Sequence, residues 1–150
     1  MINVIGLGYI GLPTALMLAS HDVEVVGTDY NKKLVETLNM GKTTFKEDGL
    51  DELFANAVSK GIKFTTEYQI TDTYIVSVPT PYDEFSKKVD PCYVISAIKT
   101  IMNVAPKGAT VVIESTVSPG TIDKYVRPVI EEHGFVIGED ISLVHAPERI

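Results

Sequence analysis

The chain has 150 residues, of which 45% are hydrophobic and 22% are charged, and its formal net charge is −7. This length is enough for one domain with a substantial core. The negative charge argues against a broad surface for nucleic acid or anionic lipids, and no apolar run is long enough to cross a membrane. A single cysteine excludes an internal disulfide, and we expect a cytoplasmic protein.

An apolar stretch at the N-terminus runs directly into a glycine-rich turn. Residues 3–5 predict a buried strand, and a helical pattern starts at Leu12. Between them lie three glycines in the G-x-G-x-x-G spacing, Gly6, Gly8 and Gly11. In this context the first glycine permits a tight turn, the second lets the backbone approach a pyrophosphate, and the third lets the helix pack on the strand. The helix N-terminus would hold the phosphates, with Tyr9 and Ile10 alongside.

The second predicted strand, residues 23–28, leads into Asp29. A carboxylate about 20 residues beyond such a turn hydrogen-bonds the ribose hydroxyls of NAD, and it repels the additional phosphate of NADP. No arginine adjoins Asp29, although Lys32 and Lys33 follow. Asp29 could instead be a turn residue or a helix cap, but Asn31 is the better N-cap for the next helix. The sequence therefore predicts NAD as the cofactor.

Strand and helix patterns alternate along the rest of the chain. Helices are expected around residues 34–38, 50–58, 94–102 and 122–130, and strands at residues 62–64, 74–78, 109–113 and 141–144. Asp90-Pro91 and Ser118-Pro119 each resemble an N-cap followed by a first-turn proline. This alternation predicts an α/β fold, a Rossmann-type doubly wound parallel sheet of about six strands with helices on both faces and strand order 3-2-1-4-5-6.

The predicted fold gathers the distinctive segments at one edge of the sheet. In a doubly wound sheet, ligands bind beyond the carboxyl ends of the strands. The segments that follow strands are Gly6 to Gly11, Asp29, Pro79-Thr80-Pro81, Glu114-Ser115-Thr116 and Pro147-Glu148-Arg149. We therefore expect every candidate site residue on one rim.

Four segments are distinctive as a set, namely residues 4–13, Val78-Pro79-Thr80-Pro81, Glu114-Ser115-Thr116-Val117 and Ala146-Pro147-Glu148-Arg149. Together they resemble the N-terminal, NAD-binding domain of the UDP-glucose/GDP-mannose dehydrogenase family, the nucleotide-sugar 6-dehydrogenases. The Gly-Tyr-Ile-Gly-Leu-Pro form, the Val-Pro-Thr-Pro form and the arginine after Pro-Glu favour the branch that oxidises UDP-N-acetyl-D-mannosamine over the UDP-glucose branch. The later segments disfavour a hydroxyacid or 6-phosphogluconate dehydrogenase. A nucleotide-sensing module without catalysis stays open.

The resemblance implies an NAD-dependent oxidation of a UDP-sugar at C6, from alcohol through aldehyde to acid, with a cysteine nucleophile from a later part of the family chain. It assigns Thr116 to positioning the hydrolytic water and Glu148 to proton transfer. It places Pro79, Thr80 and Ser115 against the cofactor, together with Thr116. From the residues alone, the three hydroxyls could equally cap strand ends, and Glu148 could be a solvated carboxylate.

The cysteine of this chain does not match that nucleophile. Cys92 opens a predicted helix without a glycine-rich context, so we interpret it as a small packing residue, although a helix start can lower a thiol pKa. We assign no role to His145 or Arg149, and we expect no metal site.

The family pattern also leads to an expectation about domains. Residues 1–150 would form the NAD-binding domain of a longer protein, with a linker helix and a substrate domain following the motif-like Pro147-Glu148-Arg149. The resemblance implies a homodimer or larger assembly for the full-length protein. Residues 1–150 alone would be inactive, and they could be monomeric.

Overall fold

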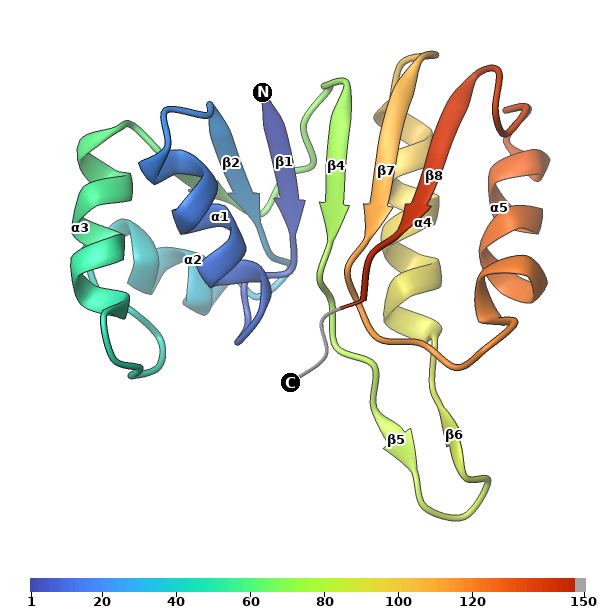
Figure 1. Ribbon diagram of the computed structural model, residues 1–150, viewed down its shortest axis with the longest axis horizontal. Helices are drawn as coiled ribbons and strands as arrows, with labels where there is room; N and C mark the ends of the chain where they lie inside the picture. Colours follow the sequence, from blue (N-terminus) through green and yellow to red (C-terminus); the bar gives the residue numbers. More distant parts are fainter. Residues whose placement is uncertain (148–150) are drawn as a thin grey trace.

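The computed structural model describes residues 1–147, which form one parallel sheet flanked by helices (Figure 1). Its strands are β1 (Ile2–Ile5), β2 (Val25–Thr28), β3 (Lys63–Thr65), β4 (Thr73–Val76), β7 (Ala109–Ile113) and β8 (Ile141–His145). They lie in the order β3-β2-β1-β4-β7-β8, and every neighbouring pair is parallel. The predicted Rossmann-type strand order is therefore confirmed.

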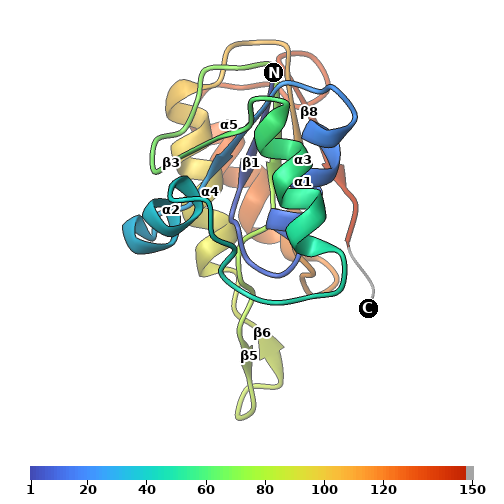
Figure 2. The ribbon, with the colours of Figure 1, turned by 90° about the vertical axis from the view of Figure 1, so that its left-hand side faces the viewer.

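Helices cover both faces of the sheet (Figures 1 and 2). They are α1 (Gly11–Ser20), α2 (Lys32–Asn39), α3 (Leu50–Ser59), α4 (Cys92–Val104), the π-helical turn η1 (Ile122–Val126) and α5 (Arg127–Glu132). Helices α1 and α3 lie on one face, whereas α4 and α5 lie on the other. Right-handed crossovers explain this arrangement. The chain adds β2 and β3 on one side of β1 and later adds β4, β7 and β8 on the other side, so the connecting helices lie on opposite faces. The strand order consequently reverses between β1 and β4.

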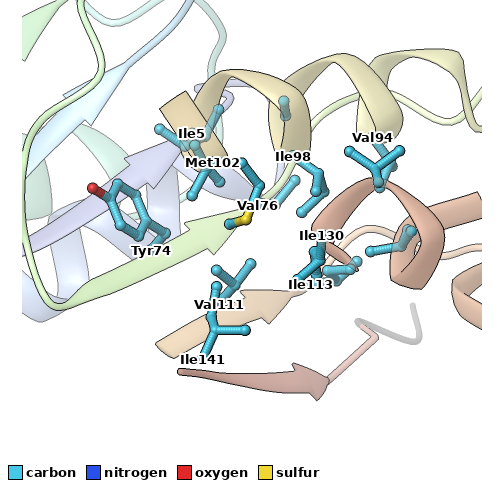
Figure 3. Close-up of a cluster of buried hydrophobic side chains, with 14 of the residues drawn as sticks. Ile5, Tyr74, Val76, Val94, Ile98, Met102, Val111, Ile113, Ile130 and Ile141 are labelled. Carbon is cyan, nitrogen blue, oxygen red and sulfur yellow. The ribbon is translucent and has the colours of Figure 1, made fainter. Parts of the chain in front are cut away.

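Each face of the sheet buries its own apolar cluster. In the cluster of Figure 3, the apolar stripe of α4 faces the strands, with Val94, Ile98 and Ile101 fully buried. Their spacing of three and four residues is that of one helix face. The opposite cluster contains Leu12 and Leu16 of α1, which are fully buried. Buried apolar side chains therefore cover both faces of the sheet.

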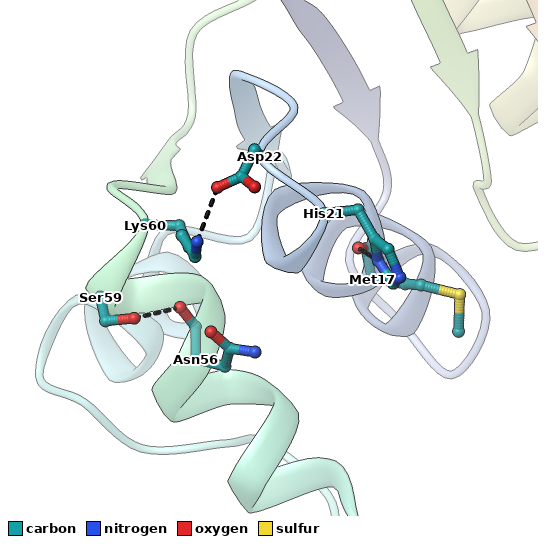
Figure 4. A network of polar contacts seen from close by, with 6 residues as sticks. All are labelled: Met17, His21, Asp22, Asn56, Ser59 and Lys60. Atoms are coloured by element: carbon teal, nitrogen blue, oxygen red, sulfur yellow. Dashed lines mark hydrogen bonds and ion pairs between the residues drawn. The ribbon is translucent and has the colours of Figure 1, made fainter.

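A polar contact joins the ends of α1 and α3 at the surface (Figure 4). Lys60 Nζ lies 2.6 Å from Asp22 Oδ1, and this hydrogen bond with Lys60 lowers the pKa of the Asp22 carboxyl. Both side chains are largely exposed, so the pair contributes little to stability. The clusters of apolar side chains, rather than ion pairs, hold the layers together.

Two helix starts differ from the prediction. Helix α4 begins one residue late, with Pro91 at the N-cap position, while the Asp90 carboxylate still accepts a hydrogen bond from the Cys92 amide at 2.9 Å. Ser118-Pro119 does not cap a helix at all. It belongs to a turn in which the Thr121 amide donates to the Ser118 carbonyl, and Gly120 there has a left-handed φ of 82°.

A small hairpin between β4 and α4 was not predicted. Strands β5 (Tyr82–Asp83) and β6 (Lys88–Val89) pair in antiparallel fashion and project beyond the carboxyl edge of the sheet (Figures 1 and 2). Phe85 at its tip is 98% exposed. None of the helices in residues 1–147 is both long and apolar enough to span a membrane.

Candidate functional site

A cavity of about 790 Å³ opens at the carboxyl edge of the sheet, next to the point where the strand order reverses. The predicted site residues that line it are Gly6, Gly8, Tyr9, Ile10, Asp29, Pro79, Thr80, Ser115 and Thr116. These residues form one continuous surface, and Gly11, which was also predicted to bind the cofactor, does not line it. Leu7, Val78 and Glu114 belong to the predicted segments and also line the cavity, together with four residues that were not predicted there, Tyr30, Asn31, Leu34 and Ser77.

The surroundings of the three glycines in the turn differ. Gly6 has a φ of 94°, and a Cβ there would overlap the carbonyl of Ser77 on the neighbouring strand. A Cβ on Gly11 would overlap the carbonyl of Gly6, so α1 packs against the turn as closely as the motif predicted. A Cβ on Gly8 would meet no atom within 4 Å. Gly6 and Gly11 thus shape the turn, and Gly8 leaves open space in front of it.

The turn holds unpaired amides, and three of their residues, Gly8, Tyr9 and Ile10, line this cavity. Among residues 1–147, the amides of Gly8, Tyr9, Ile10 and Gly11 donate no hydrogen bond, and the first turn of α1 contains no acidic side chain. These groups sit at the positive end of the helix dipole. Free amides, a positive dipole end and the open space beside Gly8 together fit a pyrophosphate group.

Asp29 is fixed in place by two backbone amides. Its Oδ2 accepts from Leu7 N and its Oδ1 from Asn31 N, both at 2.9 Å. The N-cap of α2 is Asn31, as predicted, because its side chain accepts from Leu34 N at 3.2 Å. Asp29 is therefore not a helix cap. Each carboxylate oxygen can accept a further hydrogen bond from a ligand hydroxyl.

Tyr30 lines the cavity next to Asp29. Tyr30, which is 74% exposed, stacks on Tyr93 with ring centroids 6.3 Å apart and an interplanar angle of 14°. Burial, together with the nearby Asp29 carboxylate, raises the pKa of Tyr68 to about 12. The Tyr68 phenol therefore stays protonated at neutral pH, and it can donate a hydrogen bond.

The other half of the rim follows β4 and β7. The Ser115 hydroxyl donates to the Val78 carbonyl at 2.9 Å, so it ties two strand ends together as well as lining the cavity. Thr116 is exposed and also borders a second cavity of about 360 Å³, which His145 lines. The Thr14 hydroxyl donates to Glu114 Oε1 at 2.8 Å and links α1 to the end of β7. Glu148 and Arg149 lie outside the described residues.

The interpretation of Cys92 as a packing residue is wrong. The side chain is an exposed free thiol at the first residue of α4. The helix start does not activate it either, because partial desolvation and the hydrogen bond with Asp90 raise the pKa of the thiol. Within residues 1–147, no group of three or more histidine, cysteine, aspartate or glutamate side chains could hold a metal ion.

Comparison with known families identifies the family of this chain. Residues 1–150 match the NAD-binding domain of the UDP-glucose/GDP-mannose dehydrogenase family over their whole length. The chain belongs to this family. NAD is therefore the cofactor of the domain, and the family acts on nucleotide sugars.

Individual relatives agree with this assignment. UDP-N-acetyl-D-mannosamine dehydrogenase of Methanococcus maripaludis is 41% identical over 153 residues, which cover 99% of this chain and 34% of the relative. NDP-N-acetyl-D-galactosaminuronic acid dehydrogenase of Ralstonia solanacearum is 40% identical over 99% of this chain and 37% of its own length.

The crystal structure of UDP-N-acetyl-mannosamine dehydrogenase from Staphylococcus aureus has a TM-score of 0.94 and 44% identity, covering 99% of this chain and 37% of that one. The chain thus spans about a third of the length of the relatives it matches.

Proposed function

We propose that this chain is the cofactor domain of an NAD-dependent UDP-sugar 6-dehydrogenase that oxidises UDP-N-acetyl-D-mannosamine to its uronic acid. One observation carries the proposal, namely that Gly8, Tyr9 and Ile10, whose amides are unpaired, and the fixed Asp29 carboxylate line the same cavity. They offer hydrogen-bond donors for a pyrophosphate and acceptors for ribose hydroxyls. The NAD-binding family supports the same use of the cavity.

Different residues of the cavity would bind different parts of the cofactor. The amides from Gly8 to Gly11 would hold the pyrophosphate, and Asp29 would hold the adenosine ribose. Pro79, Thr80 and Ser115 would line the half nearer to the chemistry. When bound, NAD accepts the hydride that leaves C6 of the sugar. The chain itself would orient that acceptor and exclude water from one side of it.

Two further residues, Thr116 and Glu148, would handle the hydrolytic water and the proton transfer. Thr116 would position the hydrolytic water from the border between the two cavities, and Glu148 would take or give a proton. Cys92 would not act as the nucleophile, because it does not line the cavity and the pKa of its thiol is raised. The covalent step would therefore use a cysteine from the rest of the protein.

The sugar is the finer part of the proposal. The relatives that are 40–44% identical are named for N-acetylated sugars, which supports an acetamido sugar as the substrate. UDP-glucose is the alternative. A module that binds NAD without catalysis is the second alternative, because the residues described here are concerned mainly with the cofactor. We also propose a cytoplasmic full-length protein that is at least a homodimer, with residues 1–150 as its NAD-binding domain.

Steady-state assays of the full-length protein test the proposal. UDP-N-acetyl-D-mannosamine should yield two NADH per sugar, with a higher kcat/KM than UDP-glucose. A preference for UDP-glucose would overturn the sugar assignment. NAD binding without oxidation of either sugar would instead favour the sensing module. The 150-residue chain alone should bind NAD and produce no NADH, because no second domain closes over a substrate.

A further inference from the structure

We propose that Ser77 is a cofactor-binding residue whose buried hydroxyl takes its hydrogen-bond partner from the bound pyrophosphate. This inference rests on the proposed function of the cavity. It concerns a residue that neither the glycine motif nor the acidic residue after β2 points to, since in sequence Ser77 reads as part of an apolar strand.

Ser77 lies between the end of β4 and the glycine turn. Its amide donates to the Ile5 carbonyl at 2.7 Å, which extends the pairing of β4 with β1 by one residue. A Cβ on Gly11 would come within 3.0 Å of Ser77 Cβ, and a Cβ on Gly6 would overlap the Ser77 carbonyl. Ser77 also lines the cavity. The side chain is therefore packed against the turn that would hold the phosphates.

The hydroxyl oxygen of Ser77 is buried and has no hydrogen-bond partner among residues 1–147. Leaving a hydroxyl in that state costs about 1–3 kcal/mol, so alanine would serve the fold at least as well. A serine hydroxyl can rotate between staggered positions at little cost. An unpaired hydroxyl beside a ligand cavity thus indicates a partner that arrives with the ligand.

The neighbouring groups specify the chemistry of that partner. The amides of Gly8, Tyr9, Ile10 and Gly11 are also unpaired within the described residues, and all of them are donors. A serine hydroxyl can donate as well. Only a ligand group with several acceptor oxygens satisfies all these donors at once, and the pyrophosphate is that part of NAD. Ser115 does not have this role, because its hydroxyl already donates to the Val78 carbonyl.

Ser20 provides a matched control. Its hydroxyl oxygen is the other side-chain atom in residues 1–147 that is buried without a partner, but it belongs to the last residue of α1 and does not line the cavity. Ser77→Ala and Ser20→Ala therefore remove the same kind of group. Ser77 lies beside the first residue of α1, and Ser20 is its last residue. Neither change should lower the midpoint of thermal unfolding, since each removes an unsatisfied hydroxyl.

Calorimetric titration of the 150-residue chain tests the inference. Ser77→Ala should weaken the binding of NAD and of ADP-ribose by about ten-fold, and Ser20→Ala should change neither. ADP-ribose keeps the pyrophosphate and lacks nicotinamide, so a loss confined to NAD would overturn the pyrophosphate assignment. Equal affinity of Ser77→Ala and wild type would overturn this inference alone. A wild-type chain that binds no NAD would overturn the proposed function, and the inference with it.

Discussion

The two halves of the sheet present their functional groups in different ways. Beside β1 and β2, the glycine turn and Asp29 come from one short stretch, residues 6–29, and the backbone itself connects them through the bond from Leu7 N to Asp29. Beside β4 and β7, the candidate groups come from separate loops, at Thr80 and at Thr116.

This difference separates binding from chemistry. A local unit such as residues 6–29 has its geometry fixed by short-range hydrogen bonds and by close packing at Gly6 and Gly11. Groups on separate loops are aligned only by the sheet beneath them and by contacts such as the one between Thr14 and Glu114. We therefore expect changes in the first half to affect cofactor affinity. In the second half, a change at Thr116 or Glu148 should affect turnover, whereas a change at Ser77, which packs against the glycine turn, should affect affinity.

The largest effect is expected at Gly11. In Gly11→Ala the new methyl overlaps the backbone carbonyl of Gly6, which cannot move without deforming the turn. We expect the free energy of unfolding to fall by about 3 kcal/mol and NAD affinity to fall by about 100-fold or more. Gly8→Ala is the control, because its methyl meets open space and should lower NAD affinity while leaving stability within about 0.5 kcal/mol. Wild-type affinity in Gly11→Ala would contradict the account.

A change in the second half should have the opposite signature. In the full-length protein, Glu148→Gln keeps the shape of the side chain and removes the base, so we expect kcat to fall by at least about ten-fold. The dissociation constant for NAD should stay unchanged, because the pyrophosphate site is at the glycine turn. Glu139→Gln, which alters an exposed carboxylate before β8, serves as the control. Wild-type kcat in Glu148→Gln would leave Glu148 as a solvated carboxylate.

The smallest effect is expected where the halves meet. Thr14→Val removes the hydroxyl that donates to Glu114, so urea-induced unfolding should show a loss of about 1 kcal/mol. NAD affinity should change by less than about two-fold, since the hydroxyl lies outside the cavity lining. Thr37→Val removes a hydroxyl that donates to the Lys33 carbonyl in a solvent-exposed hydrogen bond, and it should cost less. Equal stability of Thr14→Val and wild type would mean that this contact does not couple the halves.

The sequence predicted the sheet order and the glycine turn because both leave local signals. The spacing of apolar residues distinguishes strands from helices, and right-handed crossovers then restrict the order of the strands. The β5–β6 hairpin left no such signal, since each strand has two residues and its tip, Phe85, is exposed. Ser77 was missed for a related reason. Its importance lies in an unpaired hydroxyl, and hydrogen-bond pairing depends on neighbours from distant parts of the chain.

The errors at Cys92 and Ser118-Pro119 have physical causes. The buried stripe of α4 starts at Val94, and Cys92 precedes it by two residues, which places the thiol on the opposite side of the helix. The left-handed Gly120 separates Ser118-Pro119 from the next helix. That helix opens with the π turn η1, just before Pro128, which lacks the N–H that an α-helical bond would need.

Calorimetric titration of the 150-residue chain with NAD and NADP tests the central claim most directly. The claim is that residues 6–29 form the local unit that selects the cofactor, in which Asp29 accepts from the ribose hydroxyls. NAD should bind at least about ten-fold more tightly than NADP, because the carboxylate repels the additional phosphate. Equal or tighter binding of NADP would contradict the role of Asp29 and the account built on it.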